Sequence, residues 1–331
     1  MRLPITAALL VTLAACGGDP GSSTGPALPG AVSLARDQLL FDSTRASSNH
    51  EIFVMKTDGS GIQRLTNDAR YENWWARASP DRSRVLFYRS PAGSPERYEL
   101  ASLWVMNADG SGVTQLRAQG TDGWALQGHG EWSPDGQSIA MFGGSATSPQ
   151  VFVTNAQGTS PQQRSNRAGV NTDVAWSPDG QWLLFNGCPG LPCTAADYEI
   201  YVMPAAGGSA TRLSTNTVAD YDPYFSPDGR SIAWLSNVNP TGWSNAGIWA
   251  IAIAGIANTA GTWSLSNQRW LINDGQINSK PAWSLDGATI YFHRMAPLEE
   301  LAWGVFRIKP DGSGLTRMTA IGTGNNEHPS N

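Results

Sequence analysis

Short runs of β-forming residues recur along the chain, and none of them has helical spacing. The segment "EWSPDGQSIAMF" from Glu131 returns as "AWSPDGQWLLF" from Ala175, "YFSPDGRSIAWLS" from Tyr224 and "AWSLDGATIYF" from Ala282. A fainter copy, "ASPDRSRVLFY", starts at Ala78. Ser-Pro-Asp-Gly favours a tight turn, because Pro presets φ, Asp bonds back to the backbone and Gly accepts a positive φ. Each copy therefore predicts two short strands joined by a tight turn.

A third run with a central aromatic residue follows each pair, as in "EIFVM" from Glu51, "SLWVM" from Ser102 and "EIYVM" from Glu199. A second tight turn comes next, as in "KTDGSG" from Lys56 and "KPDGSG" from Lys309, and leads into a fourth run. Four strands joined in this way form one antiparallel blade, and blades of roughly 50 residues repeated radially form a β-propeller. The pattern predicts an all-β, six-bladed propeller.

The sixth blade is predicted to be split between the two ends of the sequence. The C-terminal "NNEHPSN" resembles the approach to another tight turn, and "RDQLLFDS" from Arg36 resembles the strand that should follow it. We therefore expect residues 328–331 to pair beside residues 39–41. Such pairing closes the propeller and removes two exposed sheet edges.

The repeated "WSPDG" and "DGSG" units resemble the six-bladed propeller of the TolB family, and the related repeats of tricorn-type and prolyl-peptidase propellers. The resemblance covers residues 33–331. It implies the fold, and it implies an envelope-spanning or peptidoglycan-associated assembly as the context. The TolB family also carries a separate N-terminal α/β domain, whereas only a linker precedes the first repeat here, so we expect a stand-alone, monomeric propeller.

The N-terminal residues predict export and membrane anchoring. One Arg precedes an apolar run over residues 5–15, which is too short to span a bilayer and is typical of a secretory signal. Residues 13–16, Leu-Ala-Ala-Cys, resemble a bacterial lipobox. We expect a signal peptide at residues 1–15, lipidation of Cys16, and a Gly-, Ser- and Pro-rich tether over residues 16–32. The protein is thus expected in the cell envelope, lipid-anchored on the periplasmic side or at the cell surface.

Two further cysteines, Cys188 and Cys193, flank a Pro-Gly turn in "NGCPGLPC". Outside the cytoplasm such a pair oxidises, so a disulfide is expected. The net charge is −5, without a basic run, which argues against nucleic acid as a partner.

Connection lengths divide the propeller into two faces. The tight turns are the first and third connections of each blade and share one face, which we call the turn face. The opposite face, the loop face, receives the long connections, at residues 90–101, 187–198, 237–247 and 295–303. Binding residues concentrate in such loops, so the functional surface is expected there, around the mouth of the central channel.

One position of the repeat differs in chemistry from blade to blade, as a ring that recognises a ligand would. Three residues before the motif tryptophan stand Trp75, His129, Asp173, Asp222, Lys280 and His328. We call these six residues the central ring. The alternative is that neighbours such as Asp222 and Lys280, or His129 and Asp173, only neutralise each other. Two positions further back, polar residues such as Asn73 and Asn278 indicate a repeated structural hydrogen bond.

Aromatic residues also gather in the loop-face connections. They are Trp74, Trp75, Trp124, Tyr221 and Trp243. If exposed, they would form a contact patch for a protein or a glycan. The alternative is that they pack long loops onto the rim.

No catalytic motif and no cofactor-binding motif stands out, so we predict a non-enzymatic scaffold that binds an envelope protein or peptide. One alternative is a metal-assisted lyase of uronate-containing glycans, with a metal held by His129, Asp173, Asp222 and His328. Convergence of His129 and His328 would favour that alternative. Another is a glycan-binding propeller, which requires Trp74, Trp75 and Trp243 to form one flat, exposed platform.

Overall fold

The computed structural model describes residues 32–194, 197–238, 249–295 and 302–331. The chain divides into two units, residues 1–31 and 32–331, and everything described lies in the second. No helix among these residues is long and apolar enough to cross a membrane. The predicted signal peptide and Cys16 lie outside the described residues.

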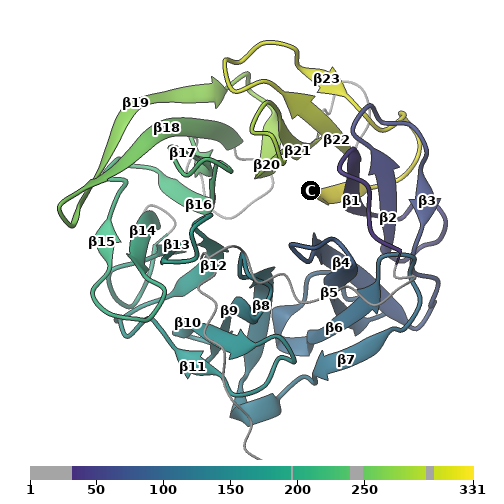
Figure 1. Cartoon of the computed structure of the whole chain (residues 1–331), viewed down its shortest axis with the longest axis horizontal. Coiled ribbons are helices and arrows are strands. Elements are labelled where there is room, and N and C mark those ends of the chain that lie inside the picture. Colours follow the sequence, from purple (N-terminus) through teal and green to yellow (C-terminus); the bar gives the residue numbers. More distant parts are fainter. Residues whose placement is uncertain (1–31, 195–196, 239–248, 296–301) are drawn as a thin grey trace, which may run out of the picture. The chain divides into compact units, whose positions relative to one another are not determined.

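Four antiparallel, four-stranded sheets are arranged around a central axis, each a blade with its first strand innermost (Figure 1). The first blade contains β24 (Asn326–Ser330), β1 (Gln38–Ser43), β2 (Glu51–Lys56) and β3 (Gln63–Arg64). The second contains β4 (Tyr71–Ala78), β5 (Arg84–Pro91), β6 (Ser102–Asn107) and β7 (Thr114–Arg117). The third contains β8 (Leu126–Trp132), β9 (Ser138–Gly144), β10 (Pro149–Asn155) and β11 (Gln162–Gln163). The fourth contains β12 (Asn171–Trp176), β13 (Trp182–Gly187), β14 (Glu199–Pro204) and β15 (Thr211–Arg212).

A larger sheet of eight strands fills the rest of the ring (Figure 1). Its first half contains β16 (Ala219–Phe225), β17 (Ser231–Asn237), β18 (Trp249–Thr259) and β19 (Thr262–Ile272). Its second half contains β20 (Ile277–Trp283), β21 (Ile290–Met295), β22 (Trp303–Ile308) and β23 (Thr316–Arg317). The halves are joined by a single parallel pair, Trp249 with Ile277. Two short 3₁₀ helices, η1 (Tyr98–Leu100) and η2 (Thr121–Gly123), lie in connections.

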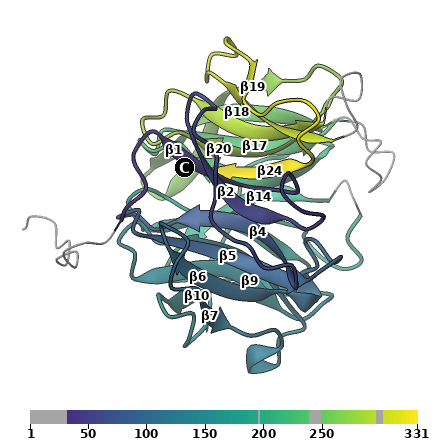
Figure 2. The same cartoon turned by 90° about the vertical axis from the view of Figure 1, so that its right-hand side faces the viewer.

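The predicted closure is confirmed. Strand β24 pairs antiparallel with β1, with Leu40 opposite Ser330 and Ser43 opposite Asn326. Figure 2 shows β24 lying among the N-terminal strands. The first blade therefore takes its inner strand from the last residues of the chain.

The "SPDG" segments form the predicted turns. In the third blade the Ser133 hydroxyl donates to Asp135 Oδ1 at 2.5 Å, and the Gln137 amide donates to the same oxygen at 3.0 Å. Gly136 has φ 68°, which a residue with a side chain rarely adopts. The motif tryptophan connects blades, because the Trp176 indole donates to the Glu131 carbonyl of the preceding blade at 3.2 Å.

Apolar side chains fill the spaces between neighbouring blades. One cluster joins Leu40, Ile52 and Val54 of the first blade to Val85 and Phe87 of the second. All five are at most 2% exposed. Because burial of this apolar surface stabilises every blade through its neighbours, the blades form a rigid frame for the centre.

Candidate functional site

The central ring is built on a backbone irregularity that occurs in every inner strand. The pairing of β4 with β5 shifts between Trp74 and Arg77, and equivalent shifts occur in β8, β12, β16, β20 and β24. The residue inside each shift has a positive φ. The six values are 57° for Trp75, 49° for His129, 52° for Asp173, 48° for Asp222, 51° for Lys280 and 48° for His328. Bulges re-aim a side chain, and a non-glycine residue rarely occupies this region.

The six ring side chains meet in one contact network. The Trp75 indole stacks on the His129 imidazole, with centroids 3.7 Å apart and planes 4° apart. Lys280 Nζ lies 4.4 Å from the Trp75 ring, and the His328 ring lies 5.4 Å from it. His129 Nδ1 contacts the Asp173 carboxylate and lies 3.9 Å from Asp222 Oδ1. The structure therefore brings together all six residues that share this position of the sequence repeat.

Two residues from the long connection between β5 and β6 reach this ring. The Tyr98 hydroxyl is 2.8 Å from His129 Nε2. Glu96 Oε1 is 3.1 Å from His328 Nε2, and Glu96 Oε2 is 3.8 Å from Lys280 Nζ. Sequence reasoning missed Glu96 and Tyr98, although both lie in a connection that it assigned to the loop face. Their contacts place the ring beneath that connection.

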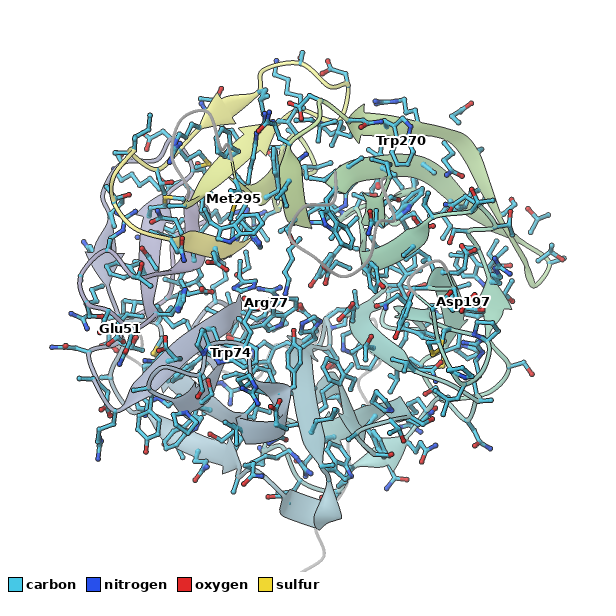
Figure 3. All side chains as sticks on the ribbon, turned by 180° about the vertical axis from the view of Figure 1, so that it is seen from behind. Glu51, Trp74, Arg77, Asp197, Trp270 and Met295 are labelled. Atoms are coloured by element: carbon cyan, nitrogen blue, oxygen red, sulfur yellow. A yellow bond between two sulfur atoms is a disulfide. The ribbon has the colours of Figure 1, made fainter. Side chains whose placement is uncertain are left out.

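A second polar layer lies two residues further along the inner strands. Arg77 Nε donates to Glu131 Oε1 at 2.5 Å, and Arg77 Nη2 donates to the Tyr224 hydroxyl at 3.1 Å. The Tyr224 hydroxyl donates to Glu131 Oε1 at 3.1 Å. Figure 3 shows Arg77 near the middle of the ring of sheets. Because these side chains come from the second blade, the third blade and the eight-stranded sheet, three sheets are linked by hydrogen bonds at this level.

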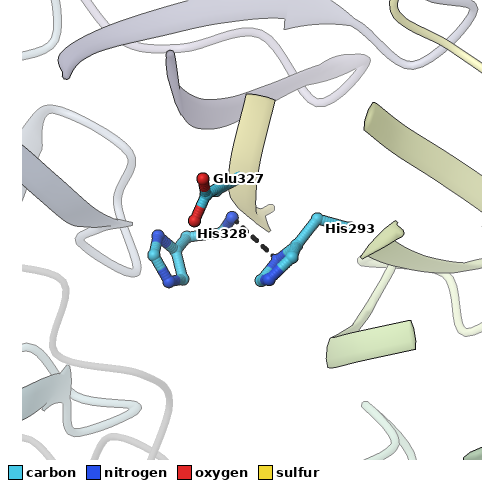
Figure 4. A group of neighbouring side chains, drawn as sticks. All are labelled: His293, Glu327 and His328. Carbon is cyan, nitrogen blue, oxygen red and sulfur yellow. Dashed lines mark hydrogen bonds between the residues drawn. The ribbon is translucent and has the colours of Figure 1, made fainter. Parts of the chain in front are cut away.

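Acidic and histidine side chains cluster on the first-blade side of the centre. His328 Nδ1 lies 2.8 Å from Asp42 Oδ1. The His328 amide donates to His293 Nδ1 at 3.1 Å, next to Glu327 (Figure 4).

Among the residues that the structure describes, two groups of side chains have potential metal-ligating atoms within 4.8 Å of one another. One contains His293, Glu327 and His328, and the other contains His129, Asp173 and Asp222. Three of the four residues expected to hold a metal, His129, Asp173 and Asp222, thus fall into one group, whereas His328 falls into the other.

Burial shifts the pKa values of the titratable side chains in the central ring. Burial raises the pKa of Asp173 to about 6, against the opposing charge of Lys280. Burial and the neighbouring Asp173 raise the pKa of Asp222 to about 6 as well. Burial lowers the pKa of His129 well below its usual value, and Lys280 adds to this effect. Near neutral pH the ring therefore contains a neutral imidazole beside two carboxylates.

His328 shows the opposite behaviour. Burial alone would lower its pKa, but the carboxylates of Asp42 and Glu96 outweigh burial and raise the pKa to about 9. Lys280 also has a raised pKa, because the charges of Glu96, Asp222 and Asp173 outweigh burial. The centre therefore has a cationic side, formed by Lys280 and His328, and an acidic side, formed by Asp173 and Asp222.

The prediction of an exposed aromatic patch is wrong for the residues that the structure describes. Trp74 and Trp75 are 1% exposed, and Trp124 and Tyr221 are 9% exposed. Trp74 stacks on Tyr88 and donates to the Ser90 hydroxyl at 3.1 Å. Trp124 packs against Phe152 and beneath the Arg117 guanidinium. These aromatics pack strands and loops together, which was the alternative reading. Trp243 lies outside the described residues.

The structural hydrogen bond expected two positions before the ring is present. Asn73 and Asn278 donate to the His50 and Trp249 carbonyls, at 3.4 and 2.8 Å. The expected disulfide between Cys188 and Cys193 is present too.

Sequence comparison gives distant relatives. No family model matches the chain. A TolB homolog of Chlorobium chlorochromatii is 29% identical over 154 residues, which is 46% of this chain and 31% of that protein. An uncharacterized protein of Agrobacterium fabrum is 26% identical over 108 residues, which is 33% of this chain and 35% of that protein. The matches thus span about a third of each relative's length.

Structural comparison covers most of the chain. TolB from Acinetobacter baumannii matches with a TM-score of 0.69 and 17% identity, over 89% of this chain and 66% of that one. A putative TolB from Agrobacterium tumefaciens matches with a TM-score of 0.61 and 17% identity, over 86% and 88%. Identities this low show the fold alone. Together with the distant TolB homolog, they identify the described part of the chain as a TolB-like β-propeller.

Proposed function

We propose that the protein is a cell-envelope scaffold that binds a protein or peptide at its loop face, over the central ring. One observation supports this proposal above the others. All six inner strands repeat the same left-handed backbone residue, yet its side chain differs in chemistry from blade to blade. Such a backbone costs about 1 kcal/mol or more at each non-glycine position. A purely structural centre could be made from one repeated apolar side chain.

The relationship to TolB supports the cellular context. TolB-like propellers fit an envelope location, and we propose that lipidation of Cys16 holds this one at a membrane surface, on the periplasmic side or outside the cell. An envelope protein, including a peptidoglycan-associated one, is the partner class that such a location favours.

We also propose that the propeller has six blades. The eight-stranded sheet contains two antiparallel runs of four strands, each with its own ring residue, Asp222 in β16 and Lys280 in β20. One residue pair joins the runs. Counting each run as a blade gives every ring residue a blade of its own.

A binding role is better supported than either alternative. Convergence of His129 and His328 would have favoured the lyase alternative, but they fall into separate groups of potential ligands. The glycan platform depended on exposed Trp74 and Trp75, which are buried.

Photo-crosslinking in cells tests the proposed function. A photoreactive amino acid at Arg97, exposed on the loop face, should give discrete crosslinked proteins, whereas one at Ser111 of the turn face should not. Lys280→Met should remove the Arg97 products in protein whose cooperative melt shows that it is still folded. Products from Ser111 alone would place the partner on the turn face and refute the proposal.

A further inference from the structure

Two cationic side chains at the centre are incompletely paired. The side chain of His328 is 1% exposed and that of Lys280 is 12% exposed. His328 Nδ1 is held by Asp42. Among the described residues, no acceptor is aligned to take a hydrogen bond from His328 Nε2, although Glu96 Oε1 lies 3.1 Å away. A buried donor left in this state is costly, so the site favours a better-placed acceptor.

One carboxylate lies near both cations and belongs to a connection rather than to a strand of a blade. Glu96 lies in the segment between β5 and β6, has φ 52°, and has a side chain that is 35% exposed. At 3.8 Å, its second oxygen is too far from Lys280 Nζ for a hydrogen bond. Burial would raise the pKa of Glu96, but the charges of Lys280 and His328 hold it well below its usual value. Glu96 is thus attracted to the cationic side, but its side chain is partly exposed, its geometry is imperfect and its backbone is left-handed.

We propose that Lys280 and His328 form a carboxylate-binding subsite, which Glu96 fills as an internal stand-in until a ligand's carboxylate displaces it. This inference rests on the proposed function, because the ligand enters from the loop face. It adds the chemistry of the ligand, which is a carboxylate-bearing group such as an acidic side chain or a peptide C-terminus.

The charges around the subsite favour a carboxylate over other ions. Two donors from neighbouring blades match the two oxygens of one carboxylate. A phosphate dianion would meet Asp42, Asp173 and Asp222 nearby, which repel additional negative charge. A cation would meet Lys280 and the protonated His328 on this side. A single negative charge therefore fits best.

Acetate binding to the full chain tests the subsite. Its dissociation constant is measured at neutral pH from the NMR shifts of the His328 imidazole, in wild-type protein and in Glu96→Ala. If Glu96 closes the subsite in about nine molecules of ten, removing it should strengthen acetate binding about tenfold. Glu96→Gly, which accepts the positive φ without strain, should give the same result if Glu96→Ala folds poorly.

Two controls make the test specific. Glu99→Ala removes a neighbouring carboxylate that pairs with Arg97 and should leave acetate binding unchanged. Adding Lys280→Met to Glu96→Ala should abolish the gain. Equal binding by wild type and Glu96→Ala, or a gain that survives Lys280→Met, would overturn the inference. If acetate binds as expected but Arg97 gives no crosslinks, the proposed function is refuted and the subsite stands. If Arg97 gives crosslinks but acetate does not bind as expected, the subsite is refuted and the proposed function stands.

Discussion

At the scale of single residues, comparing the repeats of this sequence identified the central ring but did not reveal that its residues are buried. Trp75 and His129 were selected because they occupy one repeat position, and they do stack on each other. Their burial was not evident, because a residue just before a turn motif reads as part of a connection. The bulge that re-aims these residues depends on hydrogen-bond register, which the residue pattern does not contain.

Burial changes what a Trp75 substitution can test. Truncating a buried tryptophan to alanine typically costs about 3–5 kcal/mol, so Trp75→Ala should lower the free energy of unfolding by about that much. Urea denaturation gives the value, and Ser111→Ala on the exposed turn face is the matched control. A loss below about 1 kcal/mol would show that Trp75 is not packed as the structure has it.

The acidic side of the ring should destabilise the protein as pH rises. The folded pKa of Asp222, about 6, lies above the ordinary value of 3.8, so the folded state retains a proton that the unfolded state has lost. Stability from this group is therefore present below about pH 4 and is lost as pH rises to about 6. Asp222→Asn should remove this loss.

The predicted gain of Asp222→Asn over wild type is largest above pH 7, on the order of 2–3 kcal/mol, and small near pH 4. Urea denaturation of both proteins at pH 4.5 and pH 8 measures it. A gain that does not change with pH would contradict the raised pKa. Asp173→Asn, which removes the neighbouring carboxylate, should show the same trend.

At the scale of elements, turn chemistry made the blades predictable and loop sequences hid the site. "SPDG" and "DGSG" specify backbone conformations directly, so strands and their order followed. The segment that delivers Glu96 and Tyr98 has no periodic pattern, and nothing in its composition distinguishes it from other connections. Arg77, Glu131 and Tyr224 were detectable, because all three stand one residue before the motif tryptophan position.

The disulfide of the connection between β13 and β14 should act locally. Cys188 and Cys193 are five residues apart, so the loop entropy removed from the unfolded state is small, about 2 kcal/mol or less. Replacing both cysteines with serine should lower the melting temperature by only a few degrees. Calorimetry measures the melting temperature of this variant. A loss of cooperative unfolding would show that the disulfide stabilises the whole propeller and not only its own loop.

At the scale of the whole molecule, β24 links the ends of the chain. Removing residues 326–331 would leave β1 without the strand that pairs with it. It would also delete Asn326, whose side chain donates a hydrogen bond to the Trp303 carbonyl in β22. We expect the entire propeller to lose stability, because each blade packs on the next. The melting temperature should fall markedly, and by much more than after deletion of Asn331 alone, which lies beyond β24 but contacts Gln38 and Leu285. An unchanged melt after the larger deletion would contradict closure.

The pairing of β24 with β1 also sets an order in time. Leu40 and Ser330 are neighbours in the sheet, yet the ribosome makes them nearly 300 residues apart. A growing chain therefore carries β1 as an open edge until β24 emerges, and the long loop that must close slows this pairing. His328 arrives in that same last strand. A chain that still lacks β24 can hold neither a closed ring nor the Lys280–His328 pair, so the site can form only after β24 has been made.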